Sequence, residues 1–579
     1  MRWLFAWVGF LGGGVVLAYQ QGVIPSAARW VEASGWIGVM PVRPEPPAVG
    51  TGAGDLPDAV GSTPEPPAVG TGAPVVAGTV AEVVSAAPVA TVVPVGMETT
   101  AGMVVGAGAS ASGRGEGGEE GEEWFATPLP GSDRGAERKE SVQRPLLLAT
   151  HKETWVYAAP SFKARKLGYL RAGARVTRGE KAVARGNCEG GWYRVEPRGF
   201  VCVGSGASLD LEHPVAAMAA RRPDRSKGLP YLYGMSRFPT PPFYLKLPTE
   251  QEQRSVEGDV VSHLRRYANS GAWLPDELDG VPPELLRRRI VPSLTPQQHG
   301  EGALFAGRAV PRSGFGLVSQ FEWEGRRWGL TTDFQIVPVD RLRLIQPSDF
   351  RGIDLREGGL PAAFNQAKGA RVYRRDGVTG QLRDDGPMAR RQGLALTGKQ
   401  EMIGGISFLE LRDGRLVRNT GLLRLDPPKE WPSFALEGKR WIDVSILKQT
   451  LVAYEGTKAV YATLVSTGVD GLGDPEKTHS TVRGVFLIHT KHITATMDSD
   501  EAEDRFDLRD VPYVQYFEKG YALHAAYWHD DFGKPRSHGC INLHPTDAAW
   551  LFGWTTPEVP SDWHGALTLR GGTVVYIHP

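Results

Sequence analysis

The stretch PRSHGCINLHPTDAAWLFGW, residues 535–554, is the most informative part of the chain. In it Cys540 follows His538 and Gly539, and a second histidine, His524, lies sixteen positions before the cysteine (540 minus 524). A cysteine attacks as its thiolate, and an imidazole can accept the thiol proton near neutral pH. The stretch therefore predicts a cysteine nucleophile with a histidine base.

The length and charge of the chain limit the classes of protein to which it can belong. Its 579 residues are enough for several domains, since a domain holds roughly 100 to 200 residues. Lys plus Arg and Asp plus Glu number 65 each, so no overall field attracts a nucleic acid or an acidic ligand. We expect no nucleic-acid partner, and the binding partners must be inferred from local sites.

The N-terminus carries an apolar run from Trp3 to Ala18, after Met1 and Arg2. Such a run suits the hydrophobic region of a secretion signal and is shorter than the ~20 residues that span a bilayer comfortably. Cleavage near Ala18 and an uncleaved anchor reaching Ile24 are equal alternatives. We expect residues 1–24 to be a signal peptide or membrane anchor, and the protein to be exported to the cell envelope or periplasm.

Residues 25–144 have the composition of a linker. Pro, Gly and Ala dominate, and the decapeptide PEPPAVGTGA occurs twice, at residues 44–53 and 64–73. This composition buries too little side-chain surface to offset the entropy of ordering. The segment is predicted to be a disordered tether that carries the folded part away from the membrane.

A first globular unit is predicted for residues 145–206. Short alternating runs are separated by Gly, Pro and charged turns, which is typical of a small β-barrel. The pattern WVYAAPSFKARKLGYLRAGARV, followed by GGWYRVEPRGFVCVG, resembles bacterial Src-homology-3-type domains. That resemblance implies either binding to peptidoglycan or a partner segment, or a spacer without a ligand.

Two of the three cysteines of the chain, Cys188 and Cys202, fall within this unit. An exported location permits a disulfide, and a small barrel gains stability from a covalent link. We therefore predict a Cys188–Cys202 disulfide, with two buried free thiols as the alternative. Cys540 is left without a mate, and an unpaired thiol in an oxidising compartment usually has a chemical reason.

Residues 207–437 have the composition of a globular, β-rich region but few motifs, and their role is not evident from the sequence. Two stretches, FEWEGRRWGLTTDFQIVPVDRLRL and FLELRDGRLVRNTGLLRLDPP, share an aromatic start, a charged turn with Gly and a Pro-containing end. An internal duplication of a β-module and coincidence explain this likeness equally well.

The last unit, residues 438–579, is predicted to be a β-rich sandwich. Strands are expected at 451–454 and 459–467 around a turn, then at 482–489, 511–517 and 521–526, with a short helix at 547–554 and a final strand at 571–577. The chemistry is expected in the loops between these strands.

This unit resembles the bacterial L,D-transpeptidase catalytic family. The resemblance is carried by RWIDVSILKQTLVAYEG, VRGVFLIHTK, VPYVQYF, ALHAAYWHDDFG, PRSHGCINLHPTDAAWLFGW and the terminal GTVVYI, in that order. It implies acyl transfer on peptidoglycan stem peptides, with the cysteine as nucleophile and no metal or organic cofactor. The acyl acceptor is left open between a second stem peptide, a protein, a free D-amino acid and water, and a membrane partner is expected only through the N-terminal segment.

The predicted catalytic residues are Cys540, His524, His538, Gly539 and Ser537. Cys540 is the nucleophile and His524 the base, because His524 comes from a separate strand and can approach the thiol from the side. If residues 537–540 are extended, His538 projects to the same side as Cys540 and orients or polarises the substrate. The backbone N–H groups of Gly539 and Cys540 are candidates for an oxyanion hole, and Ser537 for a hydrogen bond to histidine or substrate.

The predicted substrate-binding residues are Arg536, Tyr527, Trp528 and Asn542. Arg536 can pair with a substrate carboxylate, and Tyr527 and Trp528 can pack as walls of the cleft. His529 is the reserve base. The sequence departs from the family pattern in two places. Only twelve residues separate His524 from Ser537, which is slightly fewer than the family usually has. Residues 480–484 read STVRG, where the family often has a TPTG-like turn.

Two readings of other classes stay open. A zinc peptidase could use ligands from a group rich in histidine and aspartate, which comprises His529, His538, His544, His564, Asp530 and Asp531. No helix in the sequence carries a two-histidine ligand spacing, which weakens this hypothesis. A non-catalytic wall-binding scaffold would use the barrel and the middle region instead.

Overall fold

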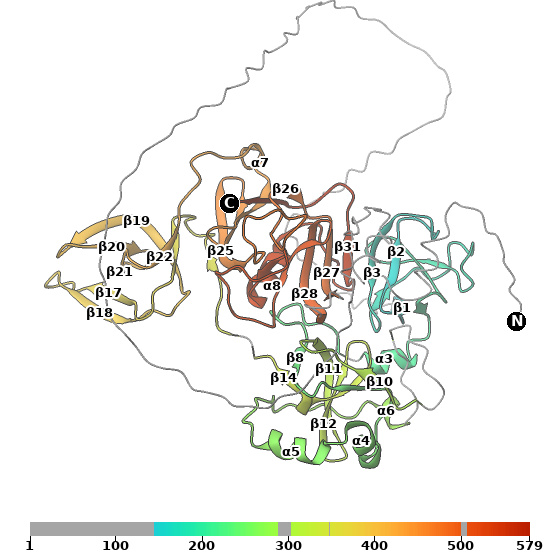
Figure 1. The fold of residues 1–579 in the computed structure, drawn as a ribbon. Coiled ribbons are helices and arrows are strands. Elements are labelled where there is room, and N and C mark those ends of the chain that lie inside the picture. Colours follow the sequence, from blue (N-terminus) through green and yellow to red (C-terminus); the bar gives the residue numbers. More distant parts are fainter. Residues whose placement is uncertain (1–143, 220, 288–293, 295–302, 347, 500–505) are drawn as a thin grey trace, which may run out of the picture. The chain divides into compact units, whose positions relative to one another are not determined.

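A computed structural model describes residues 144–219, 221–287, 294, 303–346, 348–499 and 506–579. The predicted signal or anchor and almost all of the predicted tether lie outside the described residues. Of the helices that the structure describes, none is long and apolar enough to cross a membrane. The described chain is mainly β-sheet with a few short helices, which confirms the predicted fold class (Figure 1).

The predicted barrel is a set of seven short strands, which we call module 1 (residues 146–208). The strands are β1 (Leu146–Ala149), β2 (Thr154–Tyr157), β3 (Lys166–Leu170), β4 (Arg175–Thr177), β5 (Trp192–Arg194), β6 (Phe200–Cys202) and β7 (Ala207–Ser208). Cys188 and Cys202 form a disulfide, as the sequence predicted. Both cysteines are buried beside Trp192, so the disulfide closes over the aromatic core of the module.

The middle region contains two further sets of seven strands. Module 2 (residues 232–344) comprises β8 (Leu232–Ser236), β9 (Pro242–Tyr244), β10 (Phe305–Arg308), β11 (Gly314–Trp323), β12 (Arg326–Thr331), β13 (Ile336–Pro338) and β14 (Leu342–Leu344). Module 3 (residues 362–425) comprises β16 (Ala362–Asn365), β17 (Arg371–Arg375), β18 (Leu382–Pro387), β19 (Gly393–Ile403), β20 (Ile406–Leu411), β21 (Leu416–Arg418) and β22 (Leu422–Leu425). The strand β15 (Ile353–Asp354) lies between them.

The three modules share one pattern of strand pairing. In each, the first strand pairs with the fourth and the seventh, the second pairs with the third and the sixth, and the fifth pairs with the sixth. The fourth strand meets the fifth as a hairpin in modules 2 and 3, and through the single bridge Arg178↔Val195 in module 1. The described chain therefore contains the same β-module three times in tandem.

The last three strands of modules 2 and 3 also keep one constant spacing. Strand β20 starts 80 residues after β12 (406 minus 326), and β21 starts 80 residues after β13 (416 minus 336). The tight turns before them, Glu324–Gly325 and Gly404–Gly405, have positive φ at both central residues, as a two-residue hairpin turn requires. The structure thus shows a duplication, in an alignment that places Trp328 opposite Phe408. The predicted likeness set Phe321 against Phe408, 87 residues apart (408 minus 321), and is therefore out of register with the structural repeat of 80 residues.

Module 2 differs from the other modules by helices inserted between its second and third strands. They are α4 (Glu250–Glu257), α5 (Val260–Ala268) and α6 (Pro283–Leu286). The start of α4 is a capping box, because the Thr249 hydroxyl accepts the Glu252 N–H and the Glu252 carboxylate accepts the Thr249 N–H. The middle region is β-rich, as predicted, and these helices were not among its predicted elements.

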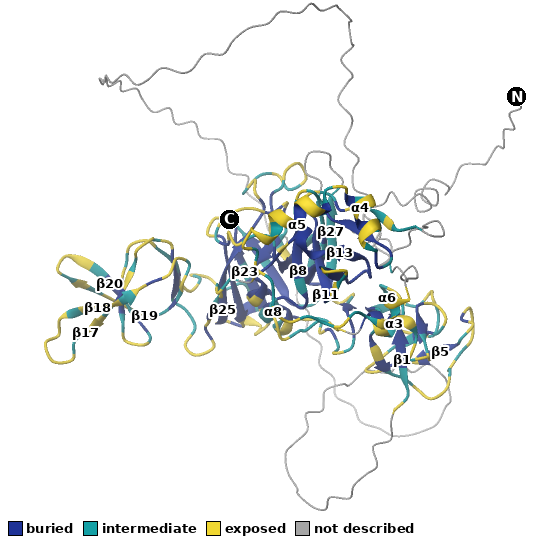
Figure 2. Ribbon diagram, turned by 90° about the horizontal axis from the view of Figure 1, so that it is seen from below, coloured by how far each residue is buried: buried dark blue, intermediate teal, exposed yellow. Residues whose placement is uncertain are grey.

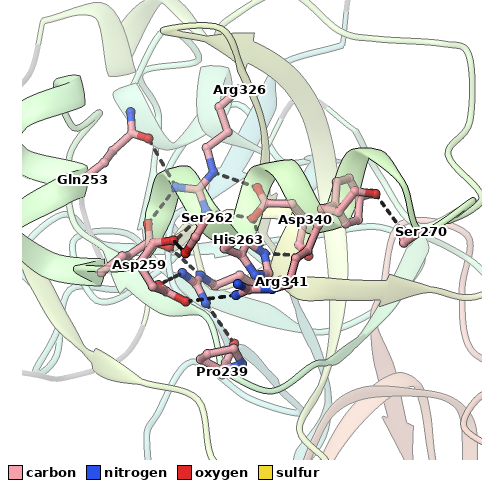
Figure 3. Close-up of polar contacts among 12 residues, drawn as sticks. Pro239, Gln253, Asp259, Ser262, His263, Ser270, Arg326, Asp340 and Arg341 are labelled. Atoms are coloured by element: carbon pink, nitrogen blue, oxygen red, sulfur yellow. Dashed lines mark hydrogen bonds and ion pairs between the residues drawn. The ribbon is translucent and has the colours of Figure 1, made fainter.

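Two buried arginines tie these helices to the strands of module 2 (Figure 3). The Nε of Arg326 donates to Asp340 at 2.7 Å, and its Nη1 donates to Glu257 at 2.7 Å. Arg341 donates from Nε to Glu257 at 2.5 Å and from Nη2 to Asp259 at 2.6 Å. Charges this deeply buried are tolerated because each has opposite charges and hydrogen bonds around it.

The C-terminal unit contains two sheets that share one long strand. One sheet has the order β26 (Gly484–Leu487), β32 (Val574–His578), β23 (Arg440–Ser445), β24 (Thr450–Glu455) and β25 (Lys458–Ser466). The other continues from β25 through β30 (Ile541–Leu543), β29 (Tyr521–Ala525), β28 (Phe506–Glu518) and β27 (Thr490–Ser499) to β31 (Gly565–Leu567).

The main core of this unit lies between the two sheets and the helix α8 (Pro545–Trp554). It contains side chains from both sheets, such as Val444 and Val465 from one and Ile493 and Leu523 from the other. Figure 2 shows β23 and β25 as largely buried, whereas β17 and β18 of module 3 carry more exposed residues. The expected strands and helix are present, and β27, β30 and β31 are strands that were not predicted.

Modules 1 and 2 are joined to the C-terminal unit through backbone pairing and buried polar contacts. Strand β3 pairs with β31, and β11 pairs with β28. Asp510, buried in β28, accepts Thr494 Oγ1 at 2.9 Å and lies 3.0 Å from Nη2 of Arg171, while its carbonyl accepts the hydroxyl of Tyr233 at 2.7 Å. One residue of the C-terminal unit thus contacts both modules.

Candidate active site

The site is built on two neighbouring parallel strands, β29 and β30. Leu523 pairs with Ile541, and His524 pairs with Asn542. Leu523 and Ile541 point into the core between the sheets, so by the alternation of side chains His524 and Asn542 point to the opposite face. Cys540 precedes Ile541 and belongs to the cluster on that opposite face. The register therefore brings the predicted nucleophile and the predicted base to one face of the sheet.

The Cys540 thiol is the one free thiol among the described residues, and it is partly exposed. Its Sγ lies 3.7 Å from the carbonyl oxygen of Gly520, at the turn between β28 and β29. Burial raises the pKa of the Cys540 thiol to about 11, and a hydrogen bond from the Ala522 backbone opposes that rise. The thiol is therefore protonated at neutral pH before a substrate arrives.

His524 is buried and oriented by its own strand. Its Nδ1 lies 3.2 Å from the carbonyl oxygen of Ala525, to which an Nδ1–H donates, so the lone pair is on Nε2. Burial lowers the pKa of His524 to about 4, and the hydrogen bond to Ala525 opposes the shift. The ring is thus neutral at physiological pH, and its free nitrogen is available as a proton acceptor.

The loop before the cysteine is fixed by hydroxyl groups. Ser537 Oγ donates to the carbonyl oxygen of Cys540 at 2.5 Å and accepts the Gly539 N–H at 3.1 Å. Thr481 Oγ1 donates to the carbonyl oxygen of Gly539 at 2.8 Å and accepts the N–H of Gly468 at 2.8 Å. The Gly539 N–H is engaged within the loop, so its predicted place in an oxyanion hole requires that this bond opens.

Gly539 is required by the shape of the loop. Its φ of +119° is a conformation that residues with a side chain rarely adopt, and a Cβ there would lie 2.7 Å from Cε1 of Tyr521. The positive φ also removes the extended geometry on which the predicted orientation of His538 depended. His538 is exposed, with its ring centroid 4.7 Å from that of His479 and 5.4 Å from that of Phe506.

Of the predicted substrate-binding residues, Trp528 and Asn542 lie beside His524, the predicted base. The ring of Trp528 is 5.7 Å from that of His524, and the amide of Asn542 is 3.0 Å from Nε2 of His529. Nδ1 of His529 accepts the backbone N–H of Asp531 at 3.2 Å. Both nitrogens of the reserve base therefore have partners, and its role in this structure is to hold Asn542.

Tyr527 and Arg536 are placed differently. Tyr527 is buried, its hydroxyl donates to the carbonyl of Arg509 at 3.1 Å, and its ring packs 4.5 Å from that of Tyr233 in module 2. Arg536 is exposed and forms an ion pair with Asp531 at 2.8 Å. Contact of either residue with a substrate stays a prediction.

Two residues of the site were missed in the sequence. Thr481 lies in the STVRG stretch that departs from the family pattern, and this departure was the signal that could have identified it. Tyr521 packs over Gly539, and its hydroxyl donates to the carbonyl of Pro475 at 3.1 Å. Each constrains the loop that carries Cys540.

The histidines that suggested a zinc site are dispersed. His544 caps α8 and contacts Ser348, whereas His564 contacts Thr494 in β27. Within the described ranges, no three or more His, Cys, Asp or Glu side chains are grouped so that they could hold a metal ion.

Comparison with known proteins addresses the C-terminal unit. The family of the L,D-transpeptidase catalytic domain (YkuD) matches residues 439–577. The match does not include module 1, whose likeness to Src-homology-3-type domains stays a prediction. A search of curated proteins found no significant match.

Solved L,D-transpeptidases from three organisms are similar to parts of the chain. An Enterococcus faecium enzyme is 22% identical over 24% of this chain and 50% of its own, with a TM-score of 0.19. An L,D-transpeptidase from Stackebrandtia nassauensis is 25% identical over 24% of this chain and 56% of its own, with a TM-score of 0.18. L,D-transpeptidase 3 from Mycobacterium tuberculosis is 19% identical over 32% of this chain and 79% of its own, with a TM-score of 0.19.

The aligned part of this chain spans about half of the first two of these proteins. Such partial likenesses add little to the match of the catalytic family, which covers both strands of the site and the Ser537–Cys540 loop. Residues 439–577 are an L,D-transpeptidase catalytic domain.

Proposed function

We propose that the protein is a peptidoglycan L,D-transpeptidase that works through a thioester on Cys540. The observation that carries the proposal is the shared face of β29 and β30, on which a single free thiol lies diagonally across from a buried neutral histidine. The family match over residues 439–577 supports stem peptides as the substrate class.

In the first half of the reaction, Cys540 Sγ attacks the carbonyl carbon between an L-centre and the terminal D-residue. Nε2 of His524 accepts the thiol proton and passes it to the nitrogen of the leaving D-residue as the C–N bond breaks. The products are a thioester and a free D-amino acid. In the second half, the side-chain amine of another stem peptide attacks the thioester, the C–S bond breaks and the thiolate regains a proton.

The resting site holds a neutral pair rather than a thiolate and an imidazolium. A thiol with its pKa at about 11 keeps its proton when the imidazole of the neighbouring strand has its pKa at about 4. Proton transfer is then coupled to attack, when the negative charge moves onto the substrate oxygen. The hydrogen bonds from Ser537 and Thr481 to the carbonyl oxygens of Cys540 and Gly539 limit the reorganisation of the loop in this step.

We further propose that the enzyme is exported and acts in the cell envelope. The support is the apolar N-terminal run, and the Cys188–Cys202 disulfide, which suits an oxidising compartment. Modules 1 to 3 are proposed to position the catalytic domain on its polymeric substrate.

The test is incubation of the full chain with disaccharide-tetrapeptides, followed by mass spectrometry of the products. We expect cross-linked dimers and a released D-residue, a thioester adduct on Cys540, and loss of all three in Cys540→Ala. His151→Ala, which changes an exposed histidine of module 1, is the matched control and should retain activity. Trimmed monomers without dimers would point to an L,D-carboxypeptidase, and no turnover by the folded protein would refute the proposal.

A further inference from the structure

Module 3 contributes one side chain to the neighbourhood of the catalytic residues. Arg391, in the turn before β19, donates from Nη1 to the carbonyl of Asp530 at 2.6 Å and from Nη2 to its carboxylate at 2.6 Å. Asp530 lies in the loop between His524 and Cys540, which we call the 528–533 loop. A bidentate contact that includes the main chain fixes position as well as charge.

Further contacts hold the same point of the loop. The guanidinium of Arg391 lies 5.0 Å from the ring centroid of Phe350, which stacks on Phe532 at 5.9 Å. Ser348 Oγ donates to the Asp530 carboxylate at 3.1 Å. The segment between modules 2 and 3 thus adds a hydroxyl and a ring on either side of the ion pair.

Arg391 is itself held firmly. Its φ is +65°, and its backbone N–H donates to the carbonyl of Asn365 in β16 at 2.6 Å. Module 3 is anchored nearby, because Phe364 and Leu425 share a buried cluster with Trp441 and Tyr454 of the catalytic domain. The guanidinium therefore projects from a rigid support.

The 528–533 loop also contacts His524 and Asn542, so the contact from Arg391 restrains these two residues as well. His529, next to Asp530, holds the amide of Asn542 at 3.0 Å, and Trp528 packs against His524 at 5.7 Å. We propose that Arg391 is a positioning residue, which places His524 and Asn542 for reaction at Cys540 by fixing the 528–533 loop through Asp530. Module 3 would then be part of the working enzyme and more than a spacer.

An exposed ion pair adds little stability, since such pairs typically contribute about 0 to 1 kcal/mol. The side chain of Asp530 is 44% exposed, so the expected effect of its loss is on loop geometry rather than on global unfolding. Misplacement of a catalytic group by about 1 Å can slow a reaction by roughly 100-fold, so a partial displacement should give about a tenfold loss.

The experiment compares full-chain Arg391→Met, Arg391→Lys and Asp530→Asn with the control Arg390→Met, which changes the neighbouring exposed arginine. Hydrogen exchange at the amides of residues 528–533 should become faster in Arg391→Met and Asp530→Asn and stay unchanged in Arg390→Met. Wild-type protection of these amides in Arg391→Met would overturn the inference, and this measurement does not require catalysis.

A second arm depends on the proposed function and uses imipenem as the acylating probe, followed by intact mass. The limiting acylation rate should fall about tenfold in Arg391→Met while the half-saturating concentration changes little. Arg391→Lys keeps the charge but not the bidentate contact, so it should recover only part of the rate. An unchanged limiting rate in folded Arg391→Met would overturn the inference. If wild-type protein is not acylated, the proposed function fails, and the exchange measurement alone decides the role of Arg391.

Discussion

His524 and Asn542 lie directly opposite each other on the parallel strands β29 and β30, one strand position beyond the pair formed by Leu523 and Ile541. This register determines which side chains can meet, because a shift of one residue would turn His524 into the core and Leu523 towards Cys540. The chemistry of the site thus depends on the pairing of two short strands.

The first prediction concerns the protonation of Cys540. With its pKa raised to about 11, the thiol should react slowly with iodoacetamide at pH 7, and the rate should rise about tenfold per pH unit as the thiolate fraction grows. Mass spectrometry of the full chain over pH 6 to 10 measures this. A rate that is already constant above pH 7 would show a preformed thiolate and contradict the neutral resting pair.

The second prediction concerns the base. His524→Ala should reduce acylation of Cys540 by about 100-fold or more, because a positioned general base contributes roughly 10² to 10⁴ in rate. Alkylation at pH 10 should change much less, since the solvent then removes the proton. Equal losses in His524→Ala and the control His151→Ala would argue against a role as base.

The third prediction uses two glycines of the catalytic domain. Gly539→Ala places a methyl group 2.7 Å from the Tyr521 ring at a φ of +119°, so it should abolish acylation and lower the free energy of unfolding by more than about 1 kcal/mol. Gly553→Ala, in α8 with open space around it, should raise stability by about 0.5 to 1 kcal/mol. Urea titrations with an activity assay separate the two outcomes.

The fourth prediction concerns the buried charges of module 2. Arg326→Met leaves Asp340 and Glu257 without their main partner, so it should cost about 3 to 5 kcal/mol of the free energy of unfolding. Arg254→Met, which removes an exposed pair with Glu250, should cost less than about 1 kcal/mol. Comparable effects in urea unfolding would contradict this account.

The fifth prediction is that the same cluster makes the free energy of unfolding depend on pH in the acidic range. Burial opposes ionisation of Asp340, but the hydrogen bonds and charges of Arg326 and His263 outweigh it and lower the pKa of Asp340 to about 2. A carboxylate with a lowered folded-state pKa stabilises the fold above the unfolded pKa of about 4, and this contribution is lost as pH falls through about 2. Denaturation midpoints at pH 6, 4 and 2.5 should therefore decline in wild type and much less in Asp340→Asn.

Much of the catalytic domain could be predicted because its strands alternate in the usual way. The pattern of apolar residues at 451–454 and 459–467 predicted the hairpin of β24 and β25. Strand β27 was missed because it buries polar residues, whose partners are distant in the sequence. Lys491 donates to the carbonyl of Phe552 at 2.6 Å, and His492 contacts the Tyr169 hydroxyl at 2.9 Å.

The middle region was predicted less well, for two physical reasons. The helix α4 is mostly polar and has a single aliphatic residue, although the sequence of its capping box from Thr249 to Glu252 was a usable signal. The duplication left only a weak and misaligned likeness in the sequence, because backbone pairing and turn geometry are preserved where side chains have diverged.

In the candidate site, residue types and spacing predicted Cys540 as nucleophile and His524 as base, and the structure places both on one face of the sheet. The arrangement of His538 and Gly539 was not predicted, since it depends on the positive φ at Gly539 and on the hydroxyl of Thr481, nearly sixty residues away. The contact from Arg391 has no local signal at all, because it joins a different module to the loop.

The three modules have equivalent strands. During folding, a strand of one module can therefore pair with the edge of another module in the correct geometry but in the wrong place. A strand such as β20 could in principle exchange into the place of β12, which has the same neighbours in its own module. What distinguishes them is side-chain volume, as at Trp328 and Phe408. Divergence between the copies therefore protects against strand exchange, and restoring identity between modules 2 and 3 should increase misassembly and aggregation during refolding.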